Sequence, residues 1–361
     1  MNALNRSVLS WMCILLATPA FATGRASPKQ DSAAASPPDA KHYAHRCQGH
    51  TPDRGIQPQG TLLWGTRQTW REGAQDGHAG SSVLVSVDLG GEVSKANPSI
   101  TALRLDKGHL EASPQPSIPL VGTVLKGISS DGKPVEVALC GAEPSAEDPS
   151  MVWYRIEAWN PVAQEWENPC VATPRVPDPR ALAVSGVWDV SGAHHDAQGR
   201  FTLACENGVI SKCITWGYKP WATRDGLSLA SVHQACTRMA RADYCGDGRS
   251  HTHDGTTIDM YDRYGMLVRT TQTSVDWDPN RASFEAAWAP DGATCLARTR
   301  DGRALETVLQ ECPGRFRTVA ADLGDGDRCV VQRVSVSPET YLLRNRSYGA
   351  LHGTATQARN P

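Results

Sequence analysis

Short runs of alternating or β-branched apolar residues recur along most of the chain, and each run ends at a turn rich in Gly, Pro, Asn or Asp. This pattern predicts antiparallel β-strands. In the first half the expected strands are 81–88, 100–105, 121–127, 134–140 and 151–159. In the second half they are 181–189, 201–205, 209–218, 257–261, 283–288, 293–298, 328–336 and 340–343. The fold class that we expect is mainly β, of the α+β type.

One stretch has a helical period instead. Leu229, Val232, Cys236 and Met239 recur at intervals of three and four residues, so they share one face of a helix. Turn sequences flank the stretch, with RDG before it and CGDG after it. We therefore expect one principal amphipathic helix, at about residues 227–244.

The two ends of the chain lack both patterns. Residues 1–22 predict a secretory signal peptide, because the basic Arg6 precedes an apolar run that ends at a small-x-small cleavage site at Ala22. Residues 23–45 are rich in Ser, Ala and Pro and predict a disordered linker, and residues 346–361 predict a flexible tail. No later apolar run approaches the ~20 residues of a transmembrane helix. We expect a secreted or periplasmic chain with no transmembrane segment after cleavage.

A segment with three prolines, residues 171–180, predicts a boundary in the remaining chain. We interpret residues 46–170 as an N-terminal antiparallel β module. Residues 181–345 then form a second module, which contains the helix.

The number of cysteines is typical of an exported protein. The chain has 11 cysteines, and loss of Cys13 with the signal peptide leaves ten, an even number that predicts five disulfides. The ten are Cys47, Cys140, Cys170, Cys205, Cys213, Cys236, Cys245, Cys295, Cys312 and Cys329. There is no Cys-x-x-Cys, so disulfides are favoured over a zinc site. The spacing of the cysteines does not by itself choose the pairing. The expected strands favour Cys205–Cys213 first, because the two residues face each other across a hairpin. Cys140–Cys170 is the second most favoured pair, because both residues end expected strands of the first module.

Charge narrows the class of partner. The 36 basic and 38 acidic residues give a net charge of −2, which provides no basic footprint for nucleic acid. We expect a cell-envelope or extracellular ligand instead. Trp153 and Trp159 share one face of the strand 151–159, so that face is either covered core or an aromatic platform for a ligand.

The loop GDGRSHTHDG after the helix holds the densest group of candidate chemical residues. Asp247, His251, His253 and Asp254 lie within eight positions, which is a candidate transition-metal site or an exposed turn. Cys245, with His251 or His253 as its base, is the candidate nucleophile. A free Cys245 would leave another cysteine unpaired, which argues against it.

Calcium is an alternative use of the acidic residues. One group is Asp247, Asp254, Asp259 and Asp262, and a second is Asp322, Asp325 and Asp327. Neither group fits the twelve-residue EF-hand, which needs a glutamate at its last position. We expect no cofactor, and calcium or a transition metal is the alternative.

The residues at the end of the helix have structural interpretations. Asp243 is unfavourably placed for the helix dipole, so we expect it to have a specific partner, either Arg241 or a backbone amide. Arg238 and Arg241 either bind an anionic ligand or pair with Asp243, Asp247 or a neighbouring strand. Structural roles are expected for Arg238, Arg241, Asp243, Tyr244 and Trp221.

Four separated short sequences in this region are GYKPW at 217–221, CTR at 236–238, RADYCG at 241–246 and DGT at 254–256. Together they resemble the ADYC domain, a bacterial family named for the tetrapeptide at 242–245. The resemblance covers about residues 180–315. It implies an extracytoplasmic domain and transfers no catalytic residue.

Two classes of function remain. The first is a secreted, disulfide-stabilised binding or structural module, and the second is a hydrolase or metal-dependent enzyme that uses the loop 247–262. A concave pocket that joins His251, His253 and Asp254 would favour the enzyme. Buried and mutually satisfied side chains there would favour the module.

Overall fold

The computed structural model describes residues 40–49, 61–67, 69–70, 81–90, 100–113, 115–253, 255–337 and 340–348. The predicted signal peptide, residues 23–39 of the predicted linker, Asp254 and residues 349–361 of the predicted tail lie outside this part of the chain. The mainly β fold class is confirmed, with 38% strand against 11% helix and antiparallel sheets. None of the helices in the described residues is long and apolar enough to cross a bilayer.

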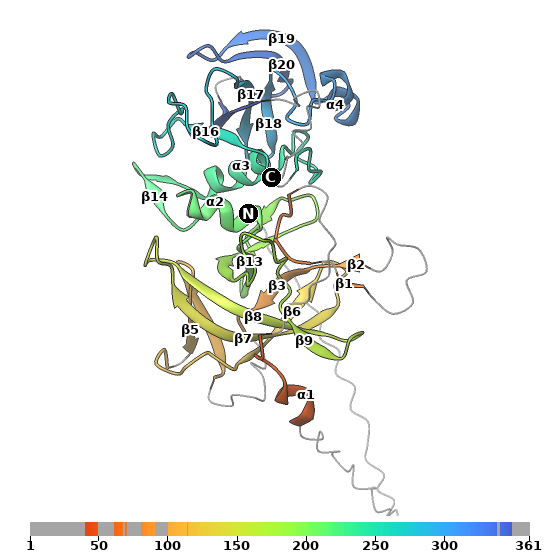
Figure 1. Ribbon diagram of the computed structural model, residues 1–361, viewed down its shortest axis with the longest axis vertical. Coiled ribbons are helices and arrows are strands. Elements are labelled where there is room, and N and C mark those ends of the chain that lie inside the picture. The colour runs from red at the N-terminus through yellow and green to blue at the C-terminus, as the bar shows by residue number, and fades with distance from the viewer. Residues whose placement is uncertain are drawn as a thin grey trace, which may run out of the picture. The chain divides into compact units, whose positions relative to one another are not determined.

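Six strands close into an antiparallel β-barrel (Figure 1). They are β3 (Leu84–Asp88), β6 (Val124–Ser129), β7 (Pro134–Pro144), β8 (Val152–Asn160), β10 (Ala181–Ser185) and β13 (Arg200–Cys205). The pairing order is β10-β13-β3-β6-β7-β8, and β10 also pairs with β8, where Ala181 lies opposite Tyr154. This second pairing closes the sheet on itself, which removes two exposed edges.

Side chains at alternate positions of the strands point inward and fill the barrel. Tyr154 and Ile156 of β8 point into the interior core, whereas Trp153 next to Tyr154 belongs to the core on the outer face. The hairpin of β4 (Ala102–Asp106) and β5 (His109–Ser113) adds Leu103 and Leu110 to the interior. The strand β8 is therefore covered on both faces at Trp153, whereas Trp159 near its end stays half-buried.

A second antiparallel sheet has six strands in the order β16-β21-β17-β18-β20-β19. The strands are β16 (Ile258–Asp262), β17 (Ser283–Ala289), β18 (Gly292–Leu296), β19 (Phe316–Asp322), β20 (Arg328–Arg333) and β21 (Leu343–Ser347). The remaining elements outside the middle layer are α1 (Ala40–Ala44), β1 (Thr69–Trp70), β2 (Ser81–Ser82), β9 (Glu165–Glu167), β11 (Val187–Trp188), β12 (His194–His195), β14 (Thr223–Arg224), β15 (Leu227–Ser228) and α4 (Leu305–Glu311).

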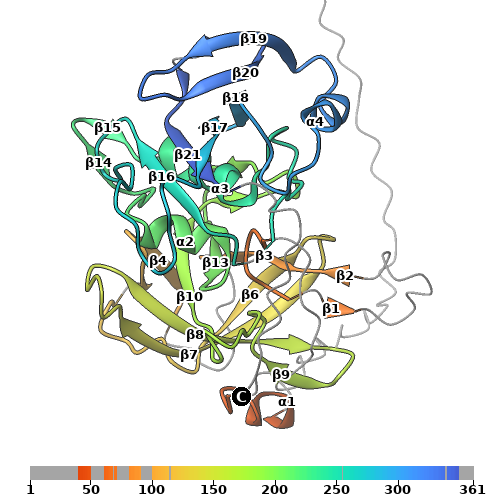
Figure 2. The ribbon, with the colours of Figure 1, turned by 45° about the horizontal axis from the view of Figure 1, so that its top comes forward.

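Two helices, α2 (Val209–Thr215) and α3 (Ala230–Arg241), lie between the barrel and the second sheet (Figure 2). One apolar core runs through all three layers: it includes Leu182 from the barrel, Met239 from α3 and Trp288 from the second sheet. The predicted helix at 227–244 is confirmed as α3 with shorter ends. The helices thus join two sheets that would otherwise each expose an apolar face.

The predicted strand 209–218 is wrong, because residues Val209–Thr215 form α2. Val209, Ile210, Cys213 and Ile214 are all buried, and this spacing of one, three and one residues places them on one face of a helix. Val209, Ile210 and Ile214 are β-branched, and this residue type by itself favours a strand. Tertiary packing against α3 overrides that propensity.

The predicted boundary at 171–180 does not separate the sheets. The strands β10 and β13 follow this segment, yet they complete the barrel begun by β3 and β6. The chain leaves the barrel after Cys205 and enters the helices. Two further predicted limits also shift, because residues 40–44 of the expected linker form α1 and residues 346–347 of the expected tail belong to β21.

The prediction of five disulfides is confirmed, and the two predicted pairings are wrong. The bonds are Cys47–Cys140, Cys170–Cys205, Cys213–Cys236, Cys245–Cys312 and Cys295–Cys329. Because residues 209–215 are helical, Cys213 faces Cys236 of α3 and not Cys205. The bond between them joins the two helices of the middle layer.

Candidate functional site

The tetrapeptide Ala242-Asp243-Tyr244-Cys245 forms the turn that ends α3, and we call these four residues the ADYC turn. Ala242 has a left-handed backbone, with φ 50° and ψ 41°, and its N–H donates to the carbonyl of Met239. Its side chain is fully buried. A left-handed residue at the helix end reverses the chain direction, so the residues that follow point back into the core.

Asp243 has a specific partner, as expected: the predicted backbone amides are confirmed, and of the two candidate arginines the one that pairs with it is Arg238 and not Arg241. The Asp243 Oδ2 atom lies 2.6 Å from Arg238 Nη1, and the carboxylate also accepts the N–H groups of Asp247 and Gly248 at 3.1 and 3.0 Å. Arg241 instead donates its Nε–H to the carbonyl of Thr61. The Asp243 side chain is 1% exposed, so this is a buried ion pair with satisfied hydrogen bonds.

Tyr244 lies in a stack of rings. Its ring centroid is 5.4 Å from that of Trp288 and 5.5 Å from that of His251, and the planes are tilted by 22° and 23°. The hydroxyl donates to Glu285 and accepts the backbone N–H of Arg300, and Glu285 and Arg300 form a second buried ion pair. Burial raises the pKa of the Tyr244 hydroxyl well above its ordinary value, so the side chain stays neutral.

The fourth residue of the turn, Cys245, is bonded to Cys312 at the end of α4. It therefore has no thiol in this structure, and the predicted thiol nucleophile is contradicted. All four residues of the ADYC turn are buried and have a partner or a packing role in the core.

The loop histidines occupy different environments. His251 is 4% exposed, and its Nδ1 and Nε2 atoms lie 3.0 Å from the Ala242 carbonyl and 3.1 Å from the Glu311 carboxylate. His253 is exposed, and Asp254 lies outside the described residues. Asp247 pairs with Arg249 at the surface. The structure therefore does not gather the described members of this predicted ligand set around one point.

In the part of the chain that the structure describes, one group of three side chains meets the distance requirement for a metal site: Cys47, Cys140 and Glu157. Its two cysteines are bonded to each other, so their sulfur atoms are not thiolate ligands.

The predicted calcium ligands that the structure describes have protein partners. Asp259 pairs with Arg346 at 2.8 Å, and Asp262 accepts the hydroxyl of Tyr218 at 2.8 Å. In the second acidic group, Asp327 is buried, and its carboxylate accepts the Tyr261 hydroxyl and pairs with Arg344. Burial raises the pKa of Asp327. The carboxylates of Asp259, Asp262 and Asp327 are therefore already bound by side chains of the fold.

Trp221 packs over the tight turn of the β4–β5 hairpin. The indole ring lies so close to Gly108 that a Cβ atom at this position would be 3.2 Å from it. Nearby, Lys219 pairs with Asp148. Lys219 and Trp221 line a hollow of about 460 Å³ together with residues of the hairpin.

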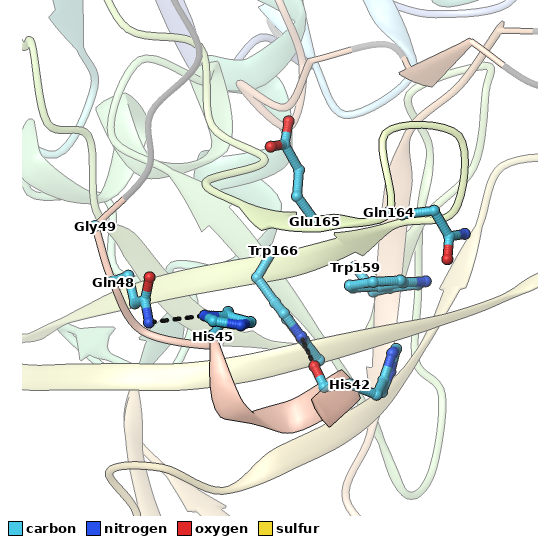
Figure 3. Close-up of a pocket in the computed structure, with 8 residues that line it drawn as sticks. All are labelled: His42, His45, Gln48, Gly49, Trp159, Gln164, Glu165 and Trp166. Atoms are coloured by element: carbon cyan, nitrogen blue, oxygen red, sulfur yellow. Dashed lines mark hydrogen bonds between the residues drawn. The ribbon is translucent and has the colours of Figure 1, made fainter. Parts of the chain in front are cut away.

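A larger hollow, which we call the aromatic pocket, lies between the β8–β9 hairpin and residues 42–49 (Figure 3). Its volume is about 520 Å³, and it is lined by His42, His45, Gln48, Gly49, Trp159, Gln164, Glu165 and Trp166. Of these residues, the sequence pattern indicates Trp159 alone as a candidate ligand contact. The missed signal is the spacing of Trp159 and Trp166 around the turn at Asn160-Pro161, which places them opposite each other in a hairpin.

Neighbouring rings hold this pocket in place. The ring of His42 lies 4.1 Å from that of Trp159, edge to face, and the indole N–H of Trp166 donates to the His42 carbonyl at 2.8 Å. His42 and Tyr43 both contact Glu136, at 2.5 and 2.7 Å. Burial, together with the hydrogen bond to Glu136, raises the pKa of Tyr43 to about 12, so its hydroxyl remains a donor.

Comparison with known proteins identifies a family. A family model described as the ADYC domain matches residues 118–302, which is more than half of the chain. No curated protein and no solved structure matches the chain. The matched range begins before β6, so it includes barrel strands that the predicted limits of 180–315 left out. The chain belongs to the ADYC domain family.

Proposed function

We propose that this chain is an exported binding protein, stabilised by its disulfides, in which the ADYC turn has a structural role. The observation that carries the proposal is the pairing of all ten cysteines that follow the predicted signal peptide. Such a set of bonds forms and persists in oxidising compartments. The expected partner is a ligand of the cell envelope or of the extracellular space.

The contacts of the loop support binding over hydrolysis. A general base must reach the proton that it removes, and His251 is buried with both ring nitrogens next to protein oxygens. Cys245 is oxidised, so it supplies no nucleophile. The aromatic pocket, in contrast, opens at the surface, where aromatic and polar side chains line it together.

Export and oxidation are tested together by expressing the full chain in a bacterium and separating the cytoplasm from the periplasm and medium. We expect the exported chain to begin near Thr23 and to weigh about 10 Da less than its reduced form, since each disulfide removes two hydrogens. The double variant Cys213→Ser/Cys236→Ser is the control, with a difference of about 8 Da.

Two outcomes would contradict the proposal. The first is a chain that stays in the cytoplasm or carries several free thiols. The second is stoichiometric metal in the purified protein that disappears in His253→Ala, since that would restore the metal-dependent enzyme.

A further inference from the structure

We propose that the aromatic pocket binds a neutral sugar ring of a glycan. This inference rests on the proposed binding function and names its site and ligand class. The pocket combines a stacking surface, uncharged polar groups at its rim and a wall that is fixed before the ligand arrives.

The stacking surface is the indole of Trp159. It is half-buried, whereas Trp166 beside it is 3% exposed and closes the base of the pocket. The two ring centroids are 5.8 Å apart because the residues face each other across the β8–β9 hairpin. An indole offers a broad, rigid apolar face at low entropic cost, which suits the C–H face of a pyranose ring.

The polar groups at the rim suit hydroxyls. Gln48 and Gln164 are exposed, and a side-chain amide both donates and accepts hydrogen bonds, as a sugar hydroxyl does. The Gln164 amide donates one N–H to the Pro161 carbonyl at 2.6 Å, so its oxygen and second N–H are the groups offered to a ligand. Figure 3 shows the amide of Gln164 beside the Trp159 ring and that of Gln48 beside His45, 3.3 Å away. Convergent polar groups around an apolar base are typical of small-molecule sites.

The charges argue for a neutral ligand. None of the described residues that line the pocket is Lys or Arg, so a phosphate or an acidic sugar would find no strong cation. Glu165 extends away from the rings in Figure 3, on the other side of its strand from Trp166. Glu136 beside the pocket already contacts His42 and Tyr43, so its carboxylate is engaged within the fold and is not placed to pair with a cationic ligand.

The opposite wall is fixed before binding. The disulfide Cys47–Cys140 ties residues 42–49 to β7, and Glu157 of β8 accepts the N–H groups of Cys47 and Gly49 at 2.5 and 2.7 Å. A wall that needs no ordering on binding leaves more of the contact energy for affinity. The volume of about 520 Å³ falls in the range of small-molecule sites.

The test uses the full mature chain and the methyl glycosides of glucose, galactose, mannose and N-acetylglucosamine. Binding is measured by saturation-transfer NMR and by titration of tryptophan fluorescence. We expect at least one glycoside to bind with a millimolar Kd and Trp159→Ala to weaken it by about tenfold or more. Trp221→Ala is the matched control, because it removes the same ring from the other hollow, and it should leave the Kd unchanged.

A second variant separates binding from folding. Gln164 has φ 56° and an exposed side chain, so Gln164→Gly removes the amide while the backbone adopts the same conformation more easily. We expect this variant to unfold at the same denaturant concentration as the wild type or a higher one, and to bind the glycoside about threefold or more weakly.

The inference is overturned if no glycoside of the panel binds, or if both variants bind as tightly as the wild type. It is also overturned if tetramethylammonium occupies the pocket more tightly than any glycoside, which would make it a cation site. An exported, fully oxidised chain that binds no glycoside would overturn the sugar inference alone.

Discussion

Asp243 is the charged residue on which the ADYC turn depends most. Replacing it by alanine leaves the Arg238 guanidinium without its counter-ion at a site that is 3% exposed, and it removes the acceptor of two backbone N–H groups. Breaking one partner of a buried ion pair costs about 3–5 kcal/mol. We expect Asp243→Ala to lower the free energy of unfolding by that amount, measured by urea denaturation of the oxidised protein.

Asp247→Ala is the matched control, since Asp247 pairs with Arg249 where both side chains are partly exposed. Such surface pairs contribute under about 1 kcal/mol. Similar losses in the two variants would show that the buried pair is not what stabilises the turn.

The two loop histidines should also differ in how much they contribute to the stability of the fold. His251 stacks on Tyr244 and contacts Ala242 and Glu311, so His251→Ala removes buried packing and leaves polar groups without partners. We expect a loss of about 1–3 kcal/mol in the same denaturation experiment. His253 is exposed, so the expected change for His253→Ala is under about 0.5 kcal/mol. A larger effect at His253 than at His251 would contradict this assignment.

The buried His233 predicts how the stability of the fold depends on pH. Burial lowers its pKa from 6.5 to about 4, and its Nε2–H donates to the Ile210 carbonyl at 2.9 Å. Between these two pKa values the unfolded chain binds a proton that the folded chain does not, so stability falls as the pH falls. The contribution of His233 is complete above pH 6.5, and we expect on the order of 3 kcal/mol of it to be lost by pH 4.

The change at His233 is isolated by comparing the wild type with His233→Gln, which keeps an N–H donor but does not titrate. The free energy of unfolding of the wild type should fall more steeply between pH 7 and 4 than that of the variant. Parallel curves would mean that His233 accepts no proton on unfolding in this range.

At the scale of elements, local pattern predicted much of the fold. The period of Leu229, Val232, Cys236 and Met239 identified α3, and alternation identified the strand that became β8. Periodicity failed at α2, where the stretch is only seven residues long and its β-branched residues suit either structure. The mistaken strand there also led to the mistaken pairing of Cys213.

Contacts between distant segments could not be predicted in the same way. The aromatic pocket combines residues near His42 with residues near Trp159, and their approach depends on the disulfide Cys47–Cys140. Cysteine spacing does not specify that bond. The residue types of the ADYC turn predicted a partner for Asp243, but they did not choose between the two arginines: Arg238 pairs with it, whereas Arg241 donates to the distant Thr61 carbonyl.

At the scale of the whole molecule, closure of the barrel is the contact that local patterns did not reveal. The strand β10 follows a proline-rich segment, so composition favoured a boundary there, yet Ala181 pairs with Tyr154 on the other side of that segment. Because α2 and α3 pack on both the barrel and the second sheet, the two sheets share one core.

The shared core has a consequence for the matched range 118–302. This range leaves out β3, which pairs with both β6 and β13, and β21, which pairs with both β16 and β17. It also separates three of the five disulfides, because Cys140, Cys245 and Cys295 lose Cys47, Cys312 and Cys329. The missing strands would open the barrel and split the second sheet.

We therefore expect a fragment of residues 118–302 to lack cooperative folding, whereas residues 40–348 should fold. Each lost disulfide alone costs about 2–5 kcal/mol, which is a large part of the stability of a domain. The measurement is near-ultraviolet circular dichroism during heating, with both fragments exported and oxidised in the same way. The long fragment should give a sharp transition and the short one a weak signal without a transition. A sharp transition in the short fragment would show that the matched range is an independent folding unit and that the outer strands are accessory.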